Sequence, residues 1–161
     1  MNAYTVLQDH HKVLRGLVKK ISSAPAASPE RQEYLDELLV ELDIHFRIED
    51  DLYYPALSAA STLVAIAHAE HRQVIDQLAV LLRTPPGAPG YEDEWRSFAT
   101  VLEAHADEEE RDMIPAPPPV QLSDEELDTL GDQMASRIKE LRDSTAHKLH
   151  VRGRKALMRA M

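Results

Sequence analysis

The chain has 161 residues, a formal net charge of −10 and no cysteine. Without cysteine there can be no disulfides, thiolate metal sites or cysteine nucleophiles, so a bound metal would need His, Asp, Glu or Tyr ligands. The acidic balance disfavours binding to nucleic acid, and no apolar run approaches the roughly 20 residues that a membrane span needs. The N-terminal residues lack a signal-peptide pattern, so we expect a cytoplasmic protein of one domain plus a small extension.

Six segments have the apolar periodicity of helices. The first covers residues 4–22 and ends at the run SSAPAASP. Ser28 is a predicted N-cap, with Pro29 at the first position of a second helix that continues to residue 54 and meets Pro55. The third covers 63–83 and the fourth 92–113, with the loop segment TPPGAPG between them. After the connector PAPPPV, the pair Ser123 and Glu126 forms a capping box that opens a helix to residue 142, and a basic helix follows over 147–160.

This pattern predicts an all-α protein. Four helices of about 20 residues joined by short loops favour an antiparallel up-down four-helix bundle over residues 1–116. Residues 117–161 are then a Pro-rich connector and a C-terminal helical extension. Because its end is basic, we expect the last helix to lie against the acidic body, with His147 and His150 on the surface.

Helices two and four contain the same motif. His45 is followed four residues later by Glu49, and His105 by Glu109, with a proline six residues after each glutamate. Residues four apart lie one turn apart on the same face of a helix. Each pair can therefore present an imidazole and a carboxylate to one metal site.

Helices one and three each add a histidine within the apolar face. His10 and His71 are both followed by apolar residues at three, four and seven positions further on, so we favour them as the inward-facing residues. Two alternatives remain open. His11 is also framed by apolar residues, and His68 lies one turn before His71.

The predicted set is four imidazoles and two carboxylates. A structural zinc ion takes only four ligands, so six ligands suit two neighbouring ions with carboxylates between them. Nitrogen and oxygen ligands without sulfur favour iron or manganese. The ferritin-like pattern needs Glu-x-x-His on two helices, and no glutamate here precedes a histidine by three residues.

The series His, His-x-x-x-Glu, His, His-x-x-x-Glu resembles the hemerythrin and hemerythrin-like (HHE cation-binding) family. The match covers residues 4–115 and includes the segments QDHHKVLRGLVKKI, HFRIEDDLYYP, AEHRQVIDQL and HADEEERDMIP. The resemblance implies a carboxylate-bridged centre of two iron ions, with Glu49 and Glu109 as the bridges. The implied ligands are His10, His45, Glu49, His71, His105 and Glu109. Residues 120–161 lie outside this match and look like the extension of actinobacterial members.

Two departures from the family's oxygen carriers stand out. Ala67 occupies the position of their fifth histidine, and the second pair is His-x-x-x-Glu instead of their His-x-x-x-x-Asp, so oxygen carriage is disfavoured. Tyr53 and Tyr54 lie one turn beyond Glu49. We favour Tyr54 as a catalytic residue with its phenol at or near the metal.

The resemblance implies redox chemistry with small ligands, namely hydrogen peroxide, nitric oxide or dioxygen. We expect reaction with peroxide or nitric oxide in oxidative or nitrosative stress defence. The alternative is an oxygen- or iron-sensing protein that binds without turnover.

Overall fold

The computed structural model describes residues 1–160, and these form helices with no strand among them. The predicted all-α class is therefore confirmed. The elements are α1 (Ala3–Ser23), α2 (Pro29–Ile48), η1 (Glu49–Tyr53), α3 (Tyr54–Ala56), α4 (Ser61–Arg83), α5 (Tyr91–Asp112), α6 (Asp124–Asp143) and α7 (Thr145–Ala160). No helix in the described part of the chain is both long and apolar enough to cross a membrane.

Four helices begin at side-chain caps, including α7, where Ser144 accepts a hydrogen bond from the N–H of His147 at 3.1 Å. Asn2 accepts a hydrogen bond from the N–H of Tyr4 at 2.7 Å, which caps α1. Ser28 accepts from the N–H of Arg31 at 3.2 Å, and Ser123 accepts from the N–H of Glu126 at 3.1 Å. The first backbone N–H groups of a helix have no partner inside the helix, so these oxygens fix where each helix starts. The predicted caps Ser28 and Ser123 are confirmed.

The predicted second helix changes its winding at Glu49. In place of one α-helix to Tyr54, α2 ends at Ile48 and a π-turn, η1, carries the chain into α3. The N–H of Tyr54 bonds the carbonyl of Glu49, five residues back. Pro55 has no N–H to continue the ladder. A π-turn is uncommon and often occurs at functional positions, since it changes which side chains face inward.

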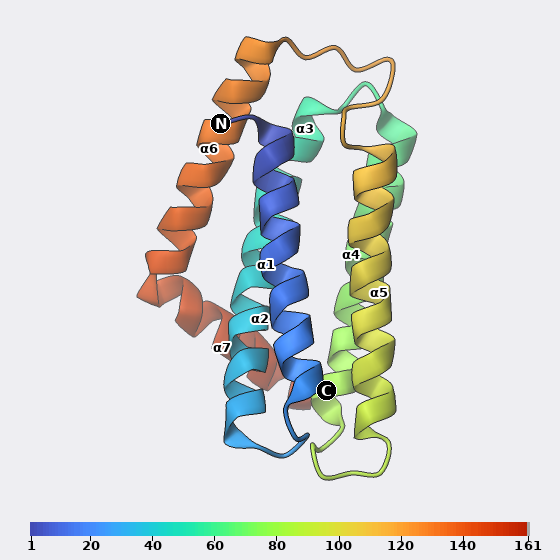
Figure 1. Ribbon diagram of the computed structural model, residues 1–161, viewed down its shortest axis with the longest axis vertical. Helices are drawn as coiled ribbons and strands as arrows, with labels where there is room; N and C mark the ends of the chain where they lie inside the picture. Colours follow the sequence, from blue (N-terminus) through green and yellow to red (C-terminus); the bar gives the residue numbers. More distant parts are fainter. Residues whose placement is uncertain (161) are drawn as a thin grey trace.

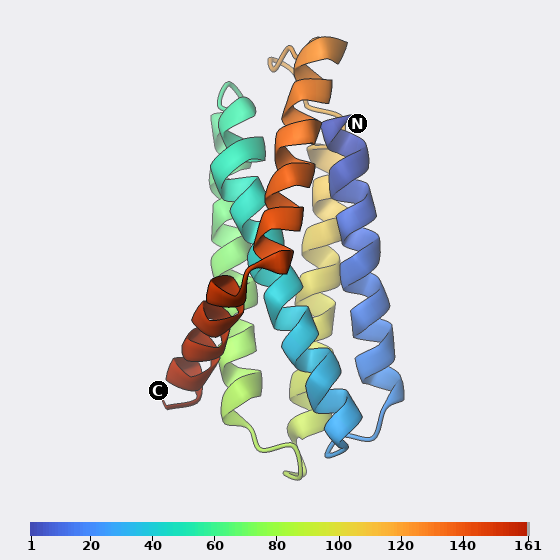
Figure 2. The ribbon, with the colours of Figure 1, turned by 90° about the vertical axis from the view of Figure 1, so that its left-hand side faces the viewer.

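The long helices α1, α2, α4 and α5 lie alongside one another along the long axis of the molecule (Figure 1). After α5 the chain crosses their upper end, and α6 descends against α1 and α2. Figure 2 shows α7 turning away from α6 and crossing α2 and α4. The two C-terminal helices therefore cover one side of the four long ones.

Ion pairs hold α7 against α2. The Nε2 atom of His147 lies 2.6 Å from Asp43 Oδ2, Arg154 pairs with the other oxygen of Asp43 at 3.0 Å, and Lys155 pairs with Asp36. The predicted contact between the basic helix and the acidic body is confirmed. The predicted surface position is correct for the exposed His150 but wrong for His147, which is buried because Asp43 holds its ring beneath α7.

Two apolar clusters fill the interior. One includes Leu14, Leu42 and Val74, and the other includes Leu7, Ile48 and Ala67. Between these residues along α1, α2 and α4 lie the histidines that the sequence singled out. The polar layer is thus enclosed above and below by apolar side chains.

Candidate metal centre

Each of the four long helices directs one buried imidazole toward the centre of this polar layer. The residues are His11 from α1, His45 from α2, His71 from α4 and His105 from α5, and none is more than 6% exposed. Glu49 of η1 and Glu109 of α5, at 0% and 2% exposure, complete the layer. Their ligand atoms form two groups that share Glu49: His11, His45, Glu49 and Glu109 in one, and Glu49, His71 and His105 in the other.

Glu49 lies at the middle of the layer. Its Oε1 atom is 3.1 Å from His45 Nε2, 3.0 Å from His71 Nε2 and 3.7 Å from His105 Nε2. Ligand atoms about 2 Å from one ion lie about 3 Å from one another. The positions around Glu49 therefore have the spacing of a coordination shell.

Glu109 occupies the opposite side of the layer. Its Oε1 atom lies 3.0 Å from His11 Nε2 and 3.9 Å from His45 Nε2, and its Oε2 atom is 3.9 Å from His105 Nε2. Glu109 thus reaches histidines of both groups, as a bridging carboxylate would.

The unsatisfied atoms of the layer fit a bound cation. Within the described residues, the Nε2 atoms of His11, His45 and His105 are buried without a hydrogen-bond partner, as are Glu49 Oε2 and Glu109 Oε1. Carboxylate oxygens lie 3.0, 3.1 and 3.7 Å from the Nε2 atoms of His11, His45 and His105, but not in hydrogen-bond geometry. Burying such atoms without a partner costs free energy. Imidazole and carboxylate donors that converge in this way are ligands for a divalent or trivalent metal ion.

The outer nitrogens of three imidazoles lie against carboxylates. The distances from Nδ1 are 2.9 Å for His11 to Glu110, 3.1 Å for His71 to Asp50 and 3.4 Å for His105 to Glu70. Metal-binding histidines commonly have such a partner, which fixes the tautomer and the orientation of the ring. In this arrangement the Nε2 atom of each of these rings faces the centre.

His45 is the exception, and its outer partner is His10. The two Nδ1 atoms lie 2.8 Å apart, and His10 Nε2 lies 3.0 Å from Glu41 Oε2. The structure thus places His10 behind His45 and outside both ligand groups, while His11, the alternative, faces the centre.

A sequence signal for this arrangement exists in the spacing of the repeat. A constant offset of 60 residues relates His45 to His105 and Glu49 to Glu109, and the same offset relates His11, not His10, to His71. The flanking apolar residues around His10 imitate the pattern at an offset of 61 residues. Register, and not local pattern, separates the two histidines.

Tyr54 lies at the centre and Tyr53 does not. The hydroxyl of Tyr54 donates to Glu109 Oε2 at 2.6 Å and lies 3.1 Å from His71 Nε2. The hydroxyl of Tyr53 donates instead to the carbonyl of Met113 at 2.5 Å. His68 lies at the edge, half exposed, with Nδ1 3.2 Å from Asp50 Oδ1.

Without a metal ion, the buried carboxyl and imidazole groups of the layer differ widely in pKa. Burial, with the neighbouring Glu49 carboxylate, raises the pKa of Glu109 to about 7. Burial lowers the pKa of His45 to about 3, so this ring is neutral and able to bind a cation. Burial also opposes the charged forms of His71 and His105, but nearby carboxylates raise their pKa values to about 9 and about 10. A cation at the centre would replace the protons held there.

Comparison with known proteins agrees with this geometry. The hemerythrin HHE cation binding domain matches residues 2–116. Uncharacterized proteins of Mycobacterium bovis (Mb2666c) and Mycobacterium tuberculosis (Rv2633c) are each 63% identical to this chain over 161 residues, which is the full length of each protein. A crystal structure of a hemerythrin HHE cation binding domain-containing protein, the Rv2633c homolog of Mycobacterium kansasii, is 67% identical with a TM-score of 0.92. The structural match covers 100% of this chain and 99% of the Mycobacterium kansasii chain.

The fold and the site define an all-helical protein with His/Glu clusters able to hold metal cations. The chain belongs to the hemerythrin HHE cation-binding domain family.

Proposed function

We propose that this chain is a non-heme di-iron protein that reacts with hydrogen peroxide or nitric oxide in oxidative or nitrosative stress defence. The observation that carries the proposal is the pair of buried ligand groups that share Glu49. One ion would use His11 and His45, the other His71 and His105, with the carboxylates of Glu49 and Glu109 shared between them. His11 takes the place that the sequence pattern favoured for His10. We also propose that residues 1–116 form the antiparallel up-down four-helix bundle and that 117–161 are an extension.

The chemistry of the bound iron would be Lewis acidity and one-electron exchange with a small oxidant. The chain itself supplies a dry and ordered site. Glu109 and His71 hold the hydroxyl of Tyr54 beside the centre. Burial, with the nearby Glu49 and Glu109 carboxylates, raises the pKa of Tyr54, so its phenol keeps a proton there until a cation competes for the oxygen. We therefore assign Tyr54 the catalytic role among the protein residues.

The surroundings of the centre favour small ligands. All six proposed ligands are buried, and apolar clusters lie on both sides of them. Surface hollows of about 470 and 350 Å³ are lined in part by His71 and by Tyr54 respectively. Ala67, where oxygen carriers of the family have a histidine, supplies no ligand, which leaves more of the coordination shell for an oxidant.

The first experiment measures metal content and peroxide consumption in protein expressed in iron-rich medium. Two molecules of hydrogen peroxide give two of water and one of dioxygen, so dioxygen release needs no added reductant. We expect two irons per chain, a visible spectrum that responds to peroxide, and dioxygen release. The control is the His45→Ala and His105→Ala double variant, which should lose all three. A wild-type chain without stoichiometric metal would contradict the proposal.

Sensing without turnover is the second candidate. It is favoured by one observation, namely that the chain of contacts from His45 through His10 and Glu41 ends on Arg142 of α6. Two irons that change spectrum but release no dioxygen, and remove no nitric oxide, would support this candidate over the enzyme.

A further inference from the structure

The support of His45 differs from that of the other three imidazoles. Glu110, Asp50 and Glu70 each lie directly against an outer Nδ1 atom, whereas His45 Nδ1 meets the Nδ1 atom of His10 at 2.8 Å. Both rings are at least 97% buried, since His45 is 1% and His10 3% exposed. Two nitrogens at this distance must share one proton, so one ring donates and the other accepts.

The proton positions in the hydrogen-bonded series His45, His10 and Glu41 follow from the groups at its two ends, which are the metal-binding His45 and the carboxylate of Glu41. A metal-binding imidazole presents a bare Nε2, so His45 carries its proton on Nδ1 and donates it to His10. The Nδ1 atom of His10 then accepts, and its own proton lies on Nε2. That N–H donates to Glu41 Oε2 at 3.0 Å, and the carboxylate is an acceptor only. A bare His10 Nε2 would face the carboxylate lone pairs, so Glu41 enforces the tautomer that His45 needs.

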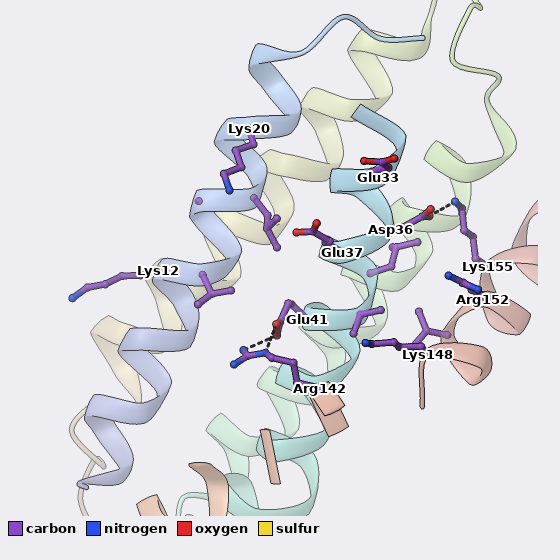
Figure 3. Close-up of a pocket in the computed structure, with 16 residues that line it drawn as sticks. Lys12, Lys20, Glu33, Asp36, Glu37, Glu41, Arg142, Lys148, Arg152 and Lys155 are labelled. Atoms are coloured by element: carbon purple, nitrogen blue, oxygen red, sulfur yellow. Dashed lines mark hydrogen bonds and ion pairs between the residues drawn. The ribbon is translucent and has the colours of Figure 1, made fainter. Parts of the chain in front are cut away.

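Arg142 of α6 holds the carboxylate of Glu41. The guanidinium donates from Nε to Oε1 at 2.6 Å and from Nη2 to Oε2 at 3.0 Å, a bidentate pair. Figure 3 shows this pair at the wall of a groove of about 720 Å³ that α1, α2, α6 and α7 line. The chain of contacts thus begins on the C-terminal extension and ends at the proposed metal centre.

The internal repeat gives an independent reason for this role. At the 60-residue offset, His10 corresponds to Glu70, and Glu41 corresponds to Val101. In the second half, Glu70 supports His105 without a relay. In the first half the supporting residue is the imidazole of His10, which needs the carboxylate of Glu41 behind it to fix its tautomer. In the second half the supporting residue is already a carboxylate, and the position that corresponds to Glu41 is the apolar Val101.

We propose that His10 is the positioning residue of His45, and that Arg142 makes the C-terminal extension part of the metal centre by holding Glu41. This inference rests on the proposed function, because it assumes that His45 binds metal.

The test is an anaerobic titration of the full chain with iron(II). Loss of a group that supports a metal-binding histidine typically lowers metal affinity about 10–100-fold. We expect His10→Leu, which has no acceptor, to lower the affinity of one of the two sites by that factor. The double variant His10→Glu with Glu41→Val copies the Glu70/Val101 arrangement and should restore it. A merely structural role would not predict this rescue.

Arg142 is tested in both backgrounds. Arg142→Ala should weaken iron(II) binding in the wild-type chain but not in the double variant, where Glu41 is absent. The matched control is Lys139→Ala, which removes an exposed pair with Asp143 on the same helix and should leave affinity unchanged. Equal affinities of Arg142→Ala and wild type would overturn the part assigned to α6.

The outcomes separate this inference from the proposed function. A wild-type chain that binds no iron overturns the proposed function. Two irons in wild type with an unchanged affinity in His10→Leu overturn only the role of His10.

A measurement on the wild-type chain covers the case that His10→Leu does not fold. In the zinc-loaded, nitrogen-15-labelled protein, His45 should carry its proton on Nδ1 and show a scalar coupling across the hydrogen bond to His10 Nδ1. The other tautomer, or no coupling, would contradict the proposal.

Discussion

At the scale of single residues, the hydroxyl of Tyr54 is the clearest protein group for chemistry at the centre. It donates to Glu109 at 2.6 Å, while the hydroxyl of the neighbouring Tyr53 bonds a backbone carbonyl. We expect Tyr54→Phe to lose any visible charge-transfer band of an iron–phenolate pair. It should also slow peroxide consumption about 10²-fold or more, because a positioned group that can exchange a proton with the oxidant is removed. Absorption spectra and dioxygen release measure the two effects. Tyr53→Phe is the control, and a band that disappears in it instead would contradict the assignment.

His11 and His68 form a second comparison at this scale. His11 lies within both hydrogen-bond reach of Glu110 and ion-pair reach of Glu109, whereas His68 is half exposed at the edge of the layer. Loss of a group that only supports a metal ligand lowers metal affinity about 10–100-fold, and loss of a ligand should lower it at least as much. We therefore expect His11→Ala to lose one iron per chain. His68→Ala should retain both irons. Metal analysis after gel filtration decides the question, and retention of two irons by His11→Ala would exclude His11 as a ligand.

At the scale of the elements, the contact of α6 with α1 depends on one glycine. A Cβ atom added at Gly131 would lie 1.9 Å from the carbonyl oxygen of Met1 and 2.7 Å from the nitrogen of Ala3. These are backbone atoms, so relief requires the N-terminus or α6 to move. The same end is held by the ammonium of Met1, 2.9 Å from Asp132.

Gly131→Ala should therefore lower the stability of the protein, although helix propensity alone would favour alanine. Alanine in a helix is favoured over glycine by about 0.5–1 kcal/mol, but overpacking costs about 1–3 kcal/mol. We expect net destabilisation in urea unfolding of the chelated protein. Gly153→Ala in α7 is the matched control, since nothing lies within 4 Å of its added Cβ, and it should stabilise. Stabilisation by both variants would show that α6 does not pack this closely on α1.

At the scale of the whole molecule, the buried polar layer links stability to metal. Binding to the folded state alone stabilises by about 2.7 kcal/mol when free metal is 100 times the dissociation constant. We expect chelation to lower the thermal midpoint clearly, and added iron(II) to restore it. The His45→Ala and His105→Ala double variant should show no such response. A wild-type midpoint that ignores both chelator and iron would contradict a metal centre in the core.

The same layer predicts a pH dependence for the chelated protein. Despite burial, neighbouring carboxylates raise the pKa values of His71 and His105 to about 9 and about 10. A raised histidine pKa stabilises fully below its unfolded value of about 6.5, and the contribution is lost as the pH rises through the folded values. Burial also raises the pKa of Glu109 to about 7, so its ionisation lowers stability in the same direction. Urea midpoints should fall from about pH 6 to about pH 10, and a rise over this range would contradict these shifts.

Much of the fold follows from the sequence because its signals are local. Apolar periodicity and the caps at Ser28 and Ser123 set the helices to within a few residues. The π-turn at Glu49–Tyr53 was not predicted, because it lies at the end of the helix next to Pro55, where too few residues follow to show a shift in the apolar spacing. The burial of His147 was also not predicted, because it depends on Asp43, which lies on a helix distant in the sequence.

The sequence by itself determined which residue types form the candidate centre, because His-x-x-x-Glu places both side chains on one helical face. It predicted His45, Glu49, His71, His105 and Glu109, and these lie together in the structure. The tertiary structure decided between His10 and His11, since apolar spacing favoured His10 and the 60-residue offset of the repeat favoured His11. Adjacent residues on a helix differ by about 100° in direction, and both positions are buried here, so local burial cannot separate them. The packing of α1 against α2 and α5 turns His11 toward Glu109 and leaves His10 against His45 and Glu41.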